Sequence, residues 1–524
     1  MGGGLRQRAG TLLFTLLIAM AHPVVAQLPP VGLPKGVFRL ELGGQFTHED
    51  SRFQDGNTQD LARAFTTSTF GGGFYGPLGA GESAIGRIIG NVNYQLNAGR
   101  IQANGLVEVG TGFIGGSFGL TSRISLFVTV PIVQTRSQIH LVYDSTGADA
   151  GFNPGDPVFG TALGQSQTTG FFTDFTAALT QLQSNINSGL YDSNPAQKQT
   201  AQEALAQGTV LRDSLTAIFA NRDAPLVPIV SSAAGTGIMD SITTYQNTLV
   251  GLSVSGFSSQ PALASQPMDS LGFQSFLTDP SGPIAVFPLE DVKRSRIGDI
   301  EGGIGYTLVD RWNRDGHPGG LRLVIEARMR FPTGLIDRSD DLIDVGTGSG
   351  HLAVGGTGTL DLGTGKVGIR IRGGYERSFA REVNRRVSSP LQPFAPASSL
   401  RTVKRQPGDL IDVAATPFFR LAPTIAVLGG VRLRRHGLDQ VSYTSAADSI
   451  PGLPASVLAE GTDWTLTTFL AGLTYQSPAA IAPGSSGFPI EASWTLEGPL
   501  SSSRGIVAKE RTMRFHLRLY TKIF

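Results

Sequence analysis

The chain has no cysteine, no excess of one charge and no long apolar run beyond its N-terminal segment. The absence of cysteine excludes a disulfide framework, a thiol nucleophile and a thiolate metal or iron–sulfur site. The 42 basic and 41 acidic residues leave no overall charge to attract nucleic acid. No later stretch approaches about 18 continuous apolar residues, so we expect no transmembrane helix in the mature protein.

Charged residues are also scarce, at 16%, whereas glycine is abundant, at 68 of 524 residues. Each interior glycine costs a helix about 1 kcal/mol, so this glycine content argues against a mainly helical protein. With 40% hydrophobic residues the chain can still bury a sizeable core. The composition therefore predicts a β-rich, turn-rich fold.

Residues 1–26 have the pattern of an export signal. Two arginines precede an apolar stretch over residues 11–21, and small residues that suit signal peptidase end at Ala26. About 11 apolar residues are too few to cross a bilayer as a helix. We therefore expect cleavage near Ala26, with a retained anchor as the alternative, and a mature protein outside the cytoplasm.

Several segments alternate apolar and polar residues, as strands in the wall of a membrane barrel do. In one of them Leu323, Ile325 and Met329 share one parity, while the other parity is rich in arginine. We predict twelve such strands, near 36–49, 102–119, 123–143, 296–309, 320–333, 351–363, 366–378, 408–421, 424–435, 463–477, 487–497 and 510–524.

Short and long connections alternate along these strands. Tight-turn residues lie at 119–123, 363–366 and 422–424, whereas most of the intervening connections are much longer. Outer-membrane barrels have this asymmetry, with short periplasmic turns, longer external loops and an even strand count. The predicted fold is an all-β, antiparallel transmembrane β-barrel of the outer membrane, with strands 1–3 in 27–143 and strands 4–12 in 296–524.

The final segment ends on Phe524, and in this it resembles the last strand of bacterial outer-membrane proteins. From this resemblance we expect the barrel-assembly machinery to be a partner of the strand. Phe524 shares the parity of Arg518 and Tyr520, however, and not that of the apolar Leu517 and Leu519.

Residues 144–295 are predicted to form a large external helical insertion between the third and fourth strands, because so long a connection is not a plain loop. Two interpretations are open: the helices pack on one another as a small cap, or the cap covers the barrel mouth and gates it. Three stripes have helical spacing, and they are Phe175, Leu179, Leu182 and Ile186; Leu211, Leu215, Ile218 and Phe219; and Ile238, Ile242, Tyr245 and Leu249.

Arginine recurs on the inward parity of the predicted strands, with acids beside it. Inward charge is expected, because an arginine on the lipid face at mid-bilayer costs about 2–4 kcal/mol. These groups either form ion pairs that stiffen the barrel or line a pore that favours anionic or polar solutes. The candidate lining residues are Arg322, Glu326, Arg328, Arg330, Arg370, Arg372, Glu376, Arg432 and Arg434.

Other motifs carry less. Gly115–Gly119 matches G-x-S-x-G, but that nucleophile motif needs a strand-to-helix turn, and here a turn and another strand follow. The histidines include no pair at i, i+4 spacing, so we expect no metal site and no cofactor. Four aspartates in one predicted external loop, Asp337, Asp340, Asp341 and Asp344, do not follow the EF-hand spacing and are interpreted as a solvated acidic loop rather than a calcium site.

Several phrases at strand-to-turn junctions resemble a loose group of Gram-negative outer-membrane barrels. The group includes the meta-pathway phenol-degradation proteins and, more distantly, the long-chain fatty-acid channels, and the resemblance implies a barrel that passes small, including hydrophobic, compounds. The N-terminal hatch of the fatty-acid channels has no match before the first strand here. The phrases are Gly119-Leu120-Thr121-Ser122-Arg123 leading to Val130-Pro131, Gly298-Asp299 leading to Gly305-Tyr306, Phe331-Pro332-Thr333-Gly334, and Pro407-Gly408-Asp409.

We therefore expect a non-enzymatic outer-membrane channel or passive transporter for small solutes, with membrane lipid and a small-molecule solute as partners and no nucleic acid. One alternative is a structural or adhesive surface protein with a closed barrel. A barrel-embedded hydrolase is the other, and it would need a serine–histidine pair on the wall that strand parity does not supply.

Overall fold

The computed structural model describes residues 32–286, 291–312, 319–336, 338–339, 346–477 and 488–523. The expected export signal at 1–26, the terminal Phe524 and the four loop aspartates Asp337, Asp340, Asp341 and Asp344 lie outside these residues.

Twelve antiparallel strands form a closed barrel in which each strand pairs with the next along the chain and the last pairs with the first. This arrangement confirms the predicted all-β barrel of about twelve strands. The strands are β1 (Val37–Glu49), β4 (Arg100–Gly119), β5 (Ile124–Asp144), β9 (Ile300–Asp310), β10 (Gly320–Phe331), β11 (Ala353–Gly363), β12 (Val367–Ser378), β15 (Leu410–Ala422), β16 (Ile425–His436), β18 (Trp464–Gln476), β19 (Ile490–Ser503) and β21 (Arg511–Lys522).

The outer face of the barrel is apolar and the inner face is polar. Side chains such as Ile325, Val413 and Phe515 are exposed on the outside, although residues of this kind are usually buried. An exposed apolar band around a closed barrel is the surface that membrane lipid covers. The fold and this band confirm the outer-membrane location expected from the sequence.

Glycine in the barrel strands makes room for aromatic rings on neighbouring strands. A Cβ atom on Gly43 would lie 2.1 Å from the ring of Phe113, and one on Gly303 would lie 2.6 Å from the ring of Phe127. The wall can therefore hold large rings in a narrow lumen only where the opposing residue has no side chain. This packing accounts for part of the glycine surplus.

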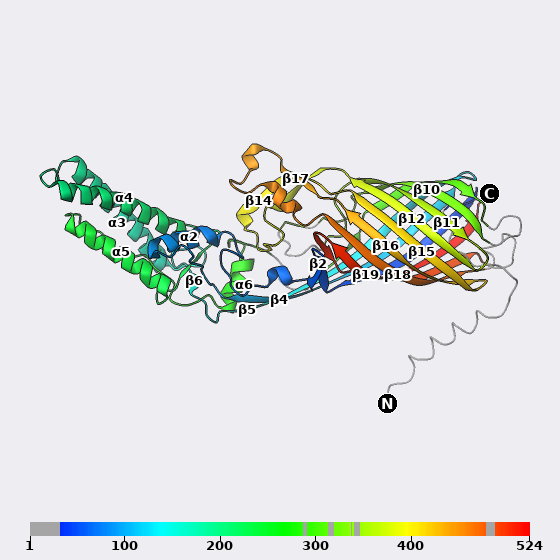
Figure 1. Cartoon of the computed structure of the whole chain (residues 1–524), viewed down its shortest axis with the longest axis horizontal. Helices are drawn as coiled ribbons and strands as arrows, with labels where there is room; N and C mark the ends of the chain where they lie inside the picture. Colours follow the sequence, from blue (N-terminus) through cyan, green and yellow to red (C-terminus); the bar gives the residue numbers. More distant parts are fainter. Residues whose placement is uncertain are drawn as a thin grey trace, which may run out of the picture.

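The short turns lie at the barrel end where the chain finishes, and the long connections lie at the other end (Figure 1). In the turn after β4, Thr121 accepts a hydrogen bond through Oγ1 from the backbone N–H of Ile124, at 2.9 Å. After β11, the N–H of Thr364 donates to the carbonyl of Val367 at 2.7 Å. Both are local hydrogen bonds that keep a turn tight.

Two of the strands, β4 and β5, are far longer than the others and leave the barrel as a ribbon (Figure 1). Barrel pairing of β4 with β1 stops at Val107, while pairing with β5 continues to Arg100 opposite Asp144. At about 3.3 Å per residue, such a strand is roughly 65 Å long, about twice the hydrocarbon core of a bilayer. The sequence pattern predicted both strands at nearly this length, at 102–119 and 123–143, but not that they leave the barrel.

A helical head sits at the far end of this ribbon, beyond the loops at the barrel rim (Figure 1). The predicted helical insertion is thus confirmed, and its three apolar stripes fall on α3, α4 and α5. None of the helices among the described residues is both long and apolar enough to cross a membrane. The head contains α2 (Leu78–Ile89), α3 (Ala162–Asn187), α4 (Pro195–Phe219), α5 (Ala233–Gly251), α6 (Ser270–Thr278), β6 (Ala150–Phe152) and β7 (Leu226–Pro228).

Each of the long helices begins at a side chain that caps it. Thr161 accepts a hydrogen bond from the N–H of Gly164 at 3.0 Å, and Asn194 accepts one from Gln197 at 3.2 Å, with Pro195 at the first helical position. Ser232 accepts from Gly235 at 3.0 Å. These caps define where the helical period starts within the insertion.

The connection near 50–101, for which the sequence predicts no helix, contributes to the head. Its helix α2 packs against α4 and α5, and its Phe70 and Tyr75 are fully buried in the same core. Phe394, from the long connection after β12, packs edge-on against Phe65 at a ring distance of 5.6 Å. The head is therefore assembled from three external connections rather than from one.

Small sheets at the rim continue the loops outside the barrel. Arg386 in one of them donates to the carbonyls of Ile284 and Ala285, which ties the rim to the base of the head. The rim strands are β2 (Ser51–Gln54), β3 (Asn57–Asp60) and β20 (Ile506–Ala508) in one sheet and β13 (Arg381–Arg386), β14 (Leu400–Gln406) and β17 (Gln440–Tyr443) in another.

The fourth predicted strand, 296–309, is two strands in the structure. β8 (Val292–Ile297) and β9 both pair with β5, and Gly298 and Asp299 interrupt the run between them. The carboxylate of Asp299 accepts hydrogen bonds from the N–H groups of Gly334 and Ser349, at 3.0 and 2.7 Å. The phrases Gly298-Asp299 and Phe331-Pro332-Thr333-Gly334 are thus joined by hydrogen bonds. These bonds stabilise the interruption between β8 and β9.

Candidate functional site: the barrel lumen

The candidate residues lie on three strands and share the inner face of the barrel. β11 separates β10 from β12 and pairs with both, so the residues on these two strands line one side of the lumen. Their function as a pore lining remains a prediction. Arg322, Glu326, Arg328 and Arg330 lie on β10, Arg370, Arg372 and Glu376 on β12, and Arg432 and Arg434 on β16.

Most of the arginines on β10 and β12 are held by carboxylates. Arg328 and Arg330 both contact Glu376, each at 2.9 Å. Arg370 donates two hydrogen bonds to Asp361, at 2.6 and 2.8 Å, which is the bidentate geometry that a guanidinium makes with a carboxylate. The Arg370–Asp361 pair joins the neighbouring strands β12 and β11, whereas Arg328 and Arg330 on β10 reach Glu376 on β12 across β11.

The opposite wall has an equivalent chain of charges. Arg432 binds Asp412 on β15 at 2.5 Å and approaches Glu497 on β19 to 3.3 Å. Glu497 also accepts from Arg514 on β21 at 2.7 Å. Arg434, nearer the rim, lies 3.5 Å from Glu510.

The lumen is densely packed toward the end with the short turns. Glu491 is only 2% exposed and accepts hydrogen bonds from Gln476 and Tyr520, at 2.7 and 2.5 Å. Arg518 lies 3.3 Å from Glu41, which also holds Arg39 at 2.6 Å. These contacts join β1, β18, β19 and β21 across the lumen near that end.

Two cavities remain in the lumen, and Arg518 of this network lines both. The first has a volume of about 260 Å³ and faces β12, β15, β16, β18, β19 and β21; the second, about 300 Å³, faces the remaining wall from β21 around to β12. We call them the apolar-sided cavity and the acid-sided cavity. Ala414, Leu428 and Leu470 line the apolar-sided cavity, whereas Glu301 and Glu326 line the acid-sided cavity.

Three arginines line both cavities and so lie between them: Arg370, Arg372 and Arg518. The first two come from β12 and the third from β21, on nearly opposite sides of the ring of strands. Arg370 and Arg518 each have a carboxylate within 4 Å. Among the described residues Arg372 has none, although Glu326 and Asp412 act on it electrostatically from farther away. We call this trio the arginine divider.

The structure therefore separates the predicted residues into two groups. Arg370, Arg372, Glu326, Arg328 and Arg432 line one or both cavities. The other four, Arg322, Arg330, Glu376 and Arg434, line neither of these cavities and form ion pairs with their neighbours.

Arg518, Asp361 and Glu497 are important in the lumen but were not among the candidates. All three lie on the inner face that strand parity defines, so the alternation contained the signal. Their importance comes from partners on other strands, since Asp361 pairs with Arg370 on the neighbouring strand and Glu497 pairs with Arg432 on the next strand but one. A single sequence does not show which residues lie opposite one another.

The structure also shows the surroundings of the G-x-S-x-G match and of the residues that could bind a metal ion. Ser117 of the G-x-S-x-G match lies within β4, 5% exposed, and accepts a hydrogen bond from Arg39 at 3.3 Å. The strand continues into a tight turn, so the strand-to-helix geometry that raises a nucleophile is not formed. Within the described ranges no group of three His, Asp or Glu side chains is placed to hold a metal ion.

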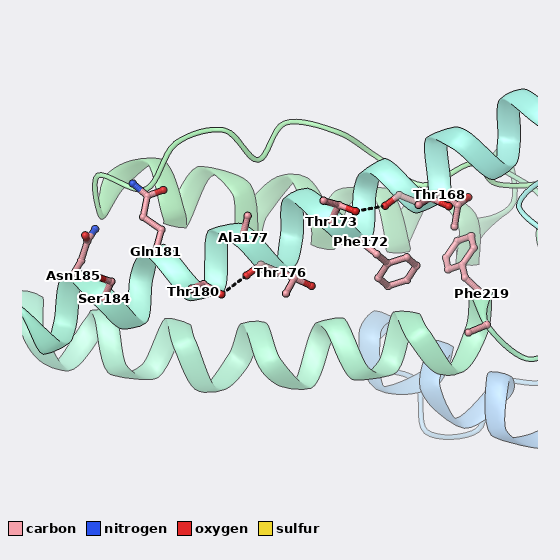
Figure 2. Close-up of a pocket in the computed structure, with 12 residues that line it drawn as sticks. Thr168, Phe172, Thr173, Thr176, Ala177, Thr180, Gln181, Ser184, Asn185 and Phe219 are labelled. Carbon is pink, nitrogen blue, oxygen red and sulfur yellow. Dashed lines mark hydrogen bonds between the residues drawn. The ribbon is translucent and has the colours of Figure 1, made fainter.

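The head carries a larger hollow, a groove of about 1010 Å³ along α3 (Figure 2). A row of threonines lines it together with Phe172 and Phe219. Thr173 and Thr180 donate their hydroxyl hydrogens to the carbonyls of Thr169 and Thr176, both at 2.9 Å. The groove residues include no ionisable side chain, so we place the candidate site in the smaller, charged cavities of the lumen.

No protein-family model matches the chain, and a search of curated proteins gives no match. Among solved structures the chain is similar to an outer membrane channel from Pseudomonas putida F1, with 10% identity, 94% of this chain and 100% of that chain covered, and a TM-score of 0.41.

A second similar structure is a mutant of the monoaromatic hydrocarbon channel TodX, with 10% identity, 94% of this chain and 91% of that chain covered, and a TM-score of 0.30. A third is the transport unit of the autotransporter AIDA-I from Escherichia coli, with 4% identity, 94% of this chain and 93% of that chain covered, and a TM-score of 0.29. The closed twelve-stranded barrel itself confirms the resemblance to outer-membrane barrels.

Proposed function

We propose that the barrel is a narrow passive channel for small, preferentially anionic solutes. The observation that supports this most directly is the arginine divider, because Arg372 has a charged group open to the lumen and no carboxylate within 4 Å in the described part of the chain. A fixed positive charge beside water-filled space lowers the barrier for anions and raises it for cations.

The net charge of the residues that line the two cavities also supports a preference for anions. The apolar-sided cavity is lined by five arginines and two acids, a surplus of 5 − 2 = 3 positive charges. The acid-sided cavity is lined by five arginines and three acids, a surplus of 5 − 3 = 2. The dense network at the turn end limits the passage to small solutes or to a conformation in which some of these ion pairs separate.

Planar-bilayer recording tests the proposal. In a KCl gradient the purified full-length protein should conduct, with a reversal potential displaced toward that of chloride, and Arg372→Glu should move the reversal potential toward that of potassium. Heat-modifiable migration on a denaturing gel shows that each sample is folded. A folded barrel that never conducts would overturn the channel.

A specific observation favours a second function, that of a closed barrel that displays a surface module. The ribbon of β4 and β5 holds the helical head beyond the rim loops (Figure 1), and a channel does not need such a support. On this alternative, deletion of the head would abolish binding of cells to a surface while leaving conductance absent in both forms.

A further inference from the structure

The apolar-sided cavity combines an unpaired cation, an unsatisfied hydroxyl and an apolar wall. This inference deepens the proposed channel and rests on it for its physiological meaning, although the site itself can be tested without transport. The lining residues come from adjacent strands of the closed wall, so the backbone holds them in place.

The positive side of the cavity is the arginine divider. A monovalent anion is the matching ligand, because one guanidinium is left without a carboxylate while the other arginines of the cavity are engaged. Arg370 holds Asp361, Arg432 holds Asp412, and Arg514 and Arg518 hold Glu497 and Glu41. A carboxylate fits the planar fork of a guanidinium through two parallel hydrogen bonds.

The hydroxyl is that of Thr474 on β18. This residue is 2% exposed, lines the same cavity, and its Oγ1 has no hydrogen-bond partner. A buried hydroxyl without a partner is unfavourable, and a ligand oxygen in the cavity would remove that cost. Thr474 therefore points, independently of the arginines, to a polar group bound here.

The apolar wall consists of Ala414, Leu428 and Leu470, on β15, β16 and β18. These apolar side chains offer a surface that a sugar or an inorganic ion would not use. The volume of about 260 Å³ lies below the range of pockets for drug-sized molecules, so the ligand is small.

We infer that the apolar-sided cavity binds a small organic carboxylate, with the carboxylate on Arg372, a hydrogen bond from Thr474, and an apolar body against Leu428 and Leu470. Neutral analogues leave Arg372 unpaired, and inorganic anions leave the apolar wall in contact with water. The site thus selects solutes by charge and apolar shape together.

Isothermal titration calorimetry of the folded full-length protein with benzoate tests this site. Benzoate should bind more tightly than acetate, which lacks the apolar body, and benzyl alcohol, which lacks the charge, should show no binding. Arg372→Gln should weaken benzoate binding about tenfold or more, and Arg372→Lys should restore only part of it, because a lysine keeps the charge but not the planar fork.

Arg377→Gln is the matched control, since Arg377 is exposed on the same strand but with the opposite parity. It removes the same charge from the protein and should leave benzoate binding unchanged. Equal binding of benzoate by wild type and Arg372→Gln, or of benzyl alcohol and benzoate by wild type, would overturn the site. A channel that conducts without binding benzoate removes this inference alone, whereas a barrel that binds benzoate but never conducts removes the proposed channel alone.

Discussion

The lumen and the helical head are both filled interiors, but opposite chemistry fills them. In the lumen, ion pairs such as Arg370 with Asp361 and Arg432 with Asp412 join neighbouring strands. In the head, the interior is aromatic and aliphatic, with Phe171, Phe175 and Phe276 at or below 1% exposure. The difference follows from what lies outside: lipid takes up the apolar side chains of the barrel strands, whereas water surrounds the head and drives its apolar side chains inward.

The head and the lumen should differ in how much stability a single substitution removes. An apolar core loses stability whenever a large side chain is removed, because the cavity left behind is filled only in part. In the charge network of the lumen, Glu376 and Glu497 each pair with two arginines, so the loss of one arginine leaves the acid with a partner. We therefore expect substitutions in the head to be the more damaging, and the barrel to survive them.

The largest effect is expected for Phe171→Ala. Phe171 is fully buried on α3, with its ring 5.5 Å from that of Phe257 and 5.7 Å from that of Phe175. The substitution should cost the head about 3–5 kcal/mol. Thermal loss of helical ellipticity and limited proteolysis should both show the head unfolding at lower temperature, while the barrel keeps its heat-modifiable migration.

Leu163→Ala is the control for that experiment, because Leu163 lies on the same helix with 69% of its surface exposed. It should change neither measurement. If Phe171→Ala also abolished the folded barrel band, the head and the barrel would be one cooperative unit, and the comparison of two separate interiors would be wrong.

Much of this division was predictable from hydrophobic periodicity. Period two along the strands identified twelve barrel strands, and the stripe Phe175, Leu179 and Leu182 identified a helix now buried in the head core. The alternation of apolar and polar residues does not show the register of the strands, that is, which residues of two paired strands lie opposite each other. It placed Arg432 on the inner face but did not select its partners Asp412 and Glu497, since a strand pair can slide by two residues without changing parity.

The same limit explains the parts of the head that were missed. Helix α2 is short and rich in glycine, with Gly79, Gly81 and Gly86 among its 12 residues, and glycine at this density is unfavourable in a helix. Phe394 joins the core from a connection that has no periodic pattern of its own. These contacts depend on the spatial proximity of external loops, which is a property of the closed barrel and not of any local segment.

A smaller effect is expected in the lumen for Arg432→Ala. Asp412 would lose the arginine that now donates to both of its oxygens, at 2.8 and 2.5 Å, and Glu497 would retain Arg514. We expect a loss of about 1–3 kcal/mol, measured as a lower temperature for conversion of the folded gel band. The head should melt as in wild type.

The double variant Arg432→Ala with Asp412→Asn distinguishes a lost charge pair from lost packing. Removal of the stranded carboxylate should recover part of the folded-band stability, because the remaining amide needs no counter-charge. A double variant no more stable than the single one would mean that Arg432 acts by filling space, and the lumen would then resemble the head more closely than its charges suggest.

The smallest effect concerns Asp149, an acid at the base of the apolar head. Burial raises the pKa of its carboxyl, although the backbone N–H of Asn97 donates to it at 2.8 Å and opposes the shift. When the pKa of a carboxyl is higher in the folded state than in the unfolded state, its protonated form favours folding. This contribution to the free energy of unfolding is present at low pH and is lost as the pH rises through the folded-state pKa. Asp149→Asn keeps the acceptor for Asn97 and removes the buried charge, so it should raise the melting temperature of the head slightly at pH 7 and leave it unchanged near pH 3.

Asp240→Asn, at an exposed position on α5, is the control and should change neither value. A destabilised Asp149→Asn head at pH 7 would show that this interior tolerates a charge as the lumen does, and the contrast between the two interiors would hold for their aromatic centres but not for their edges.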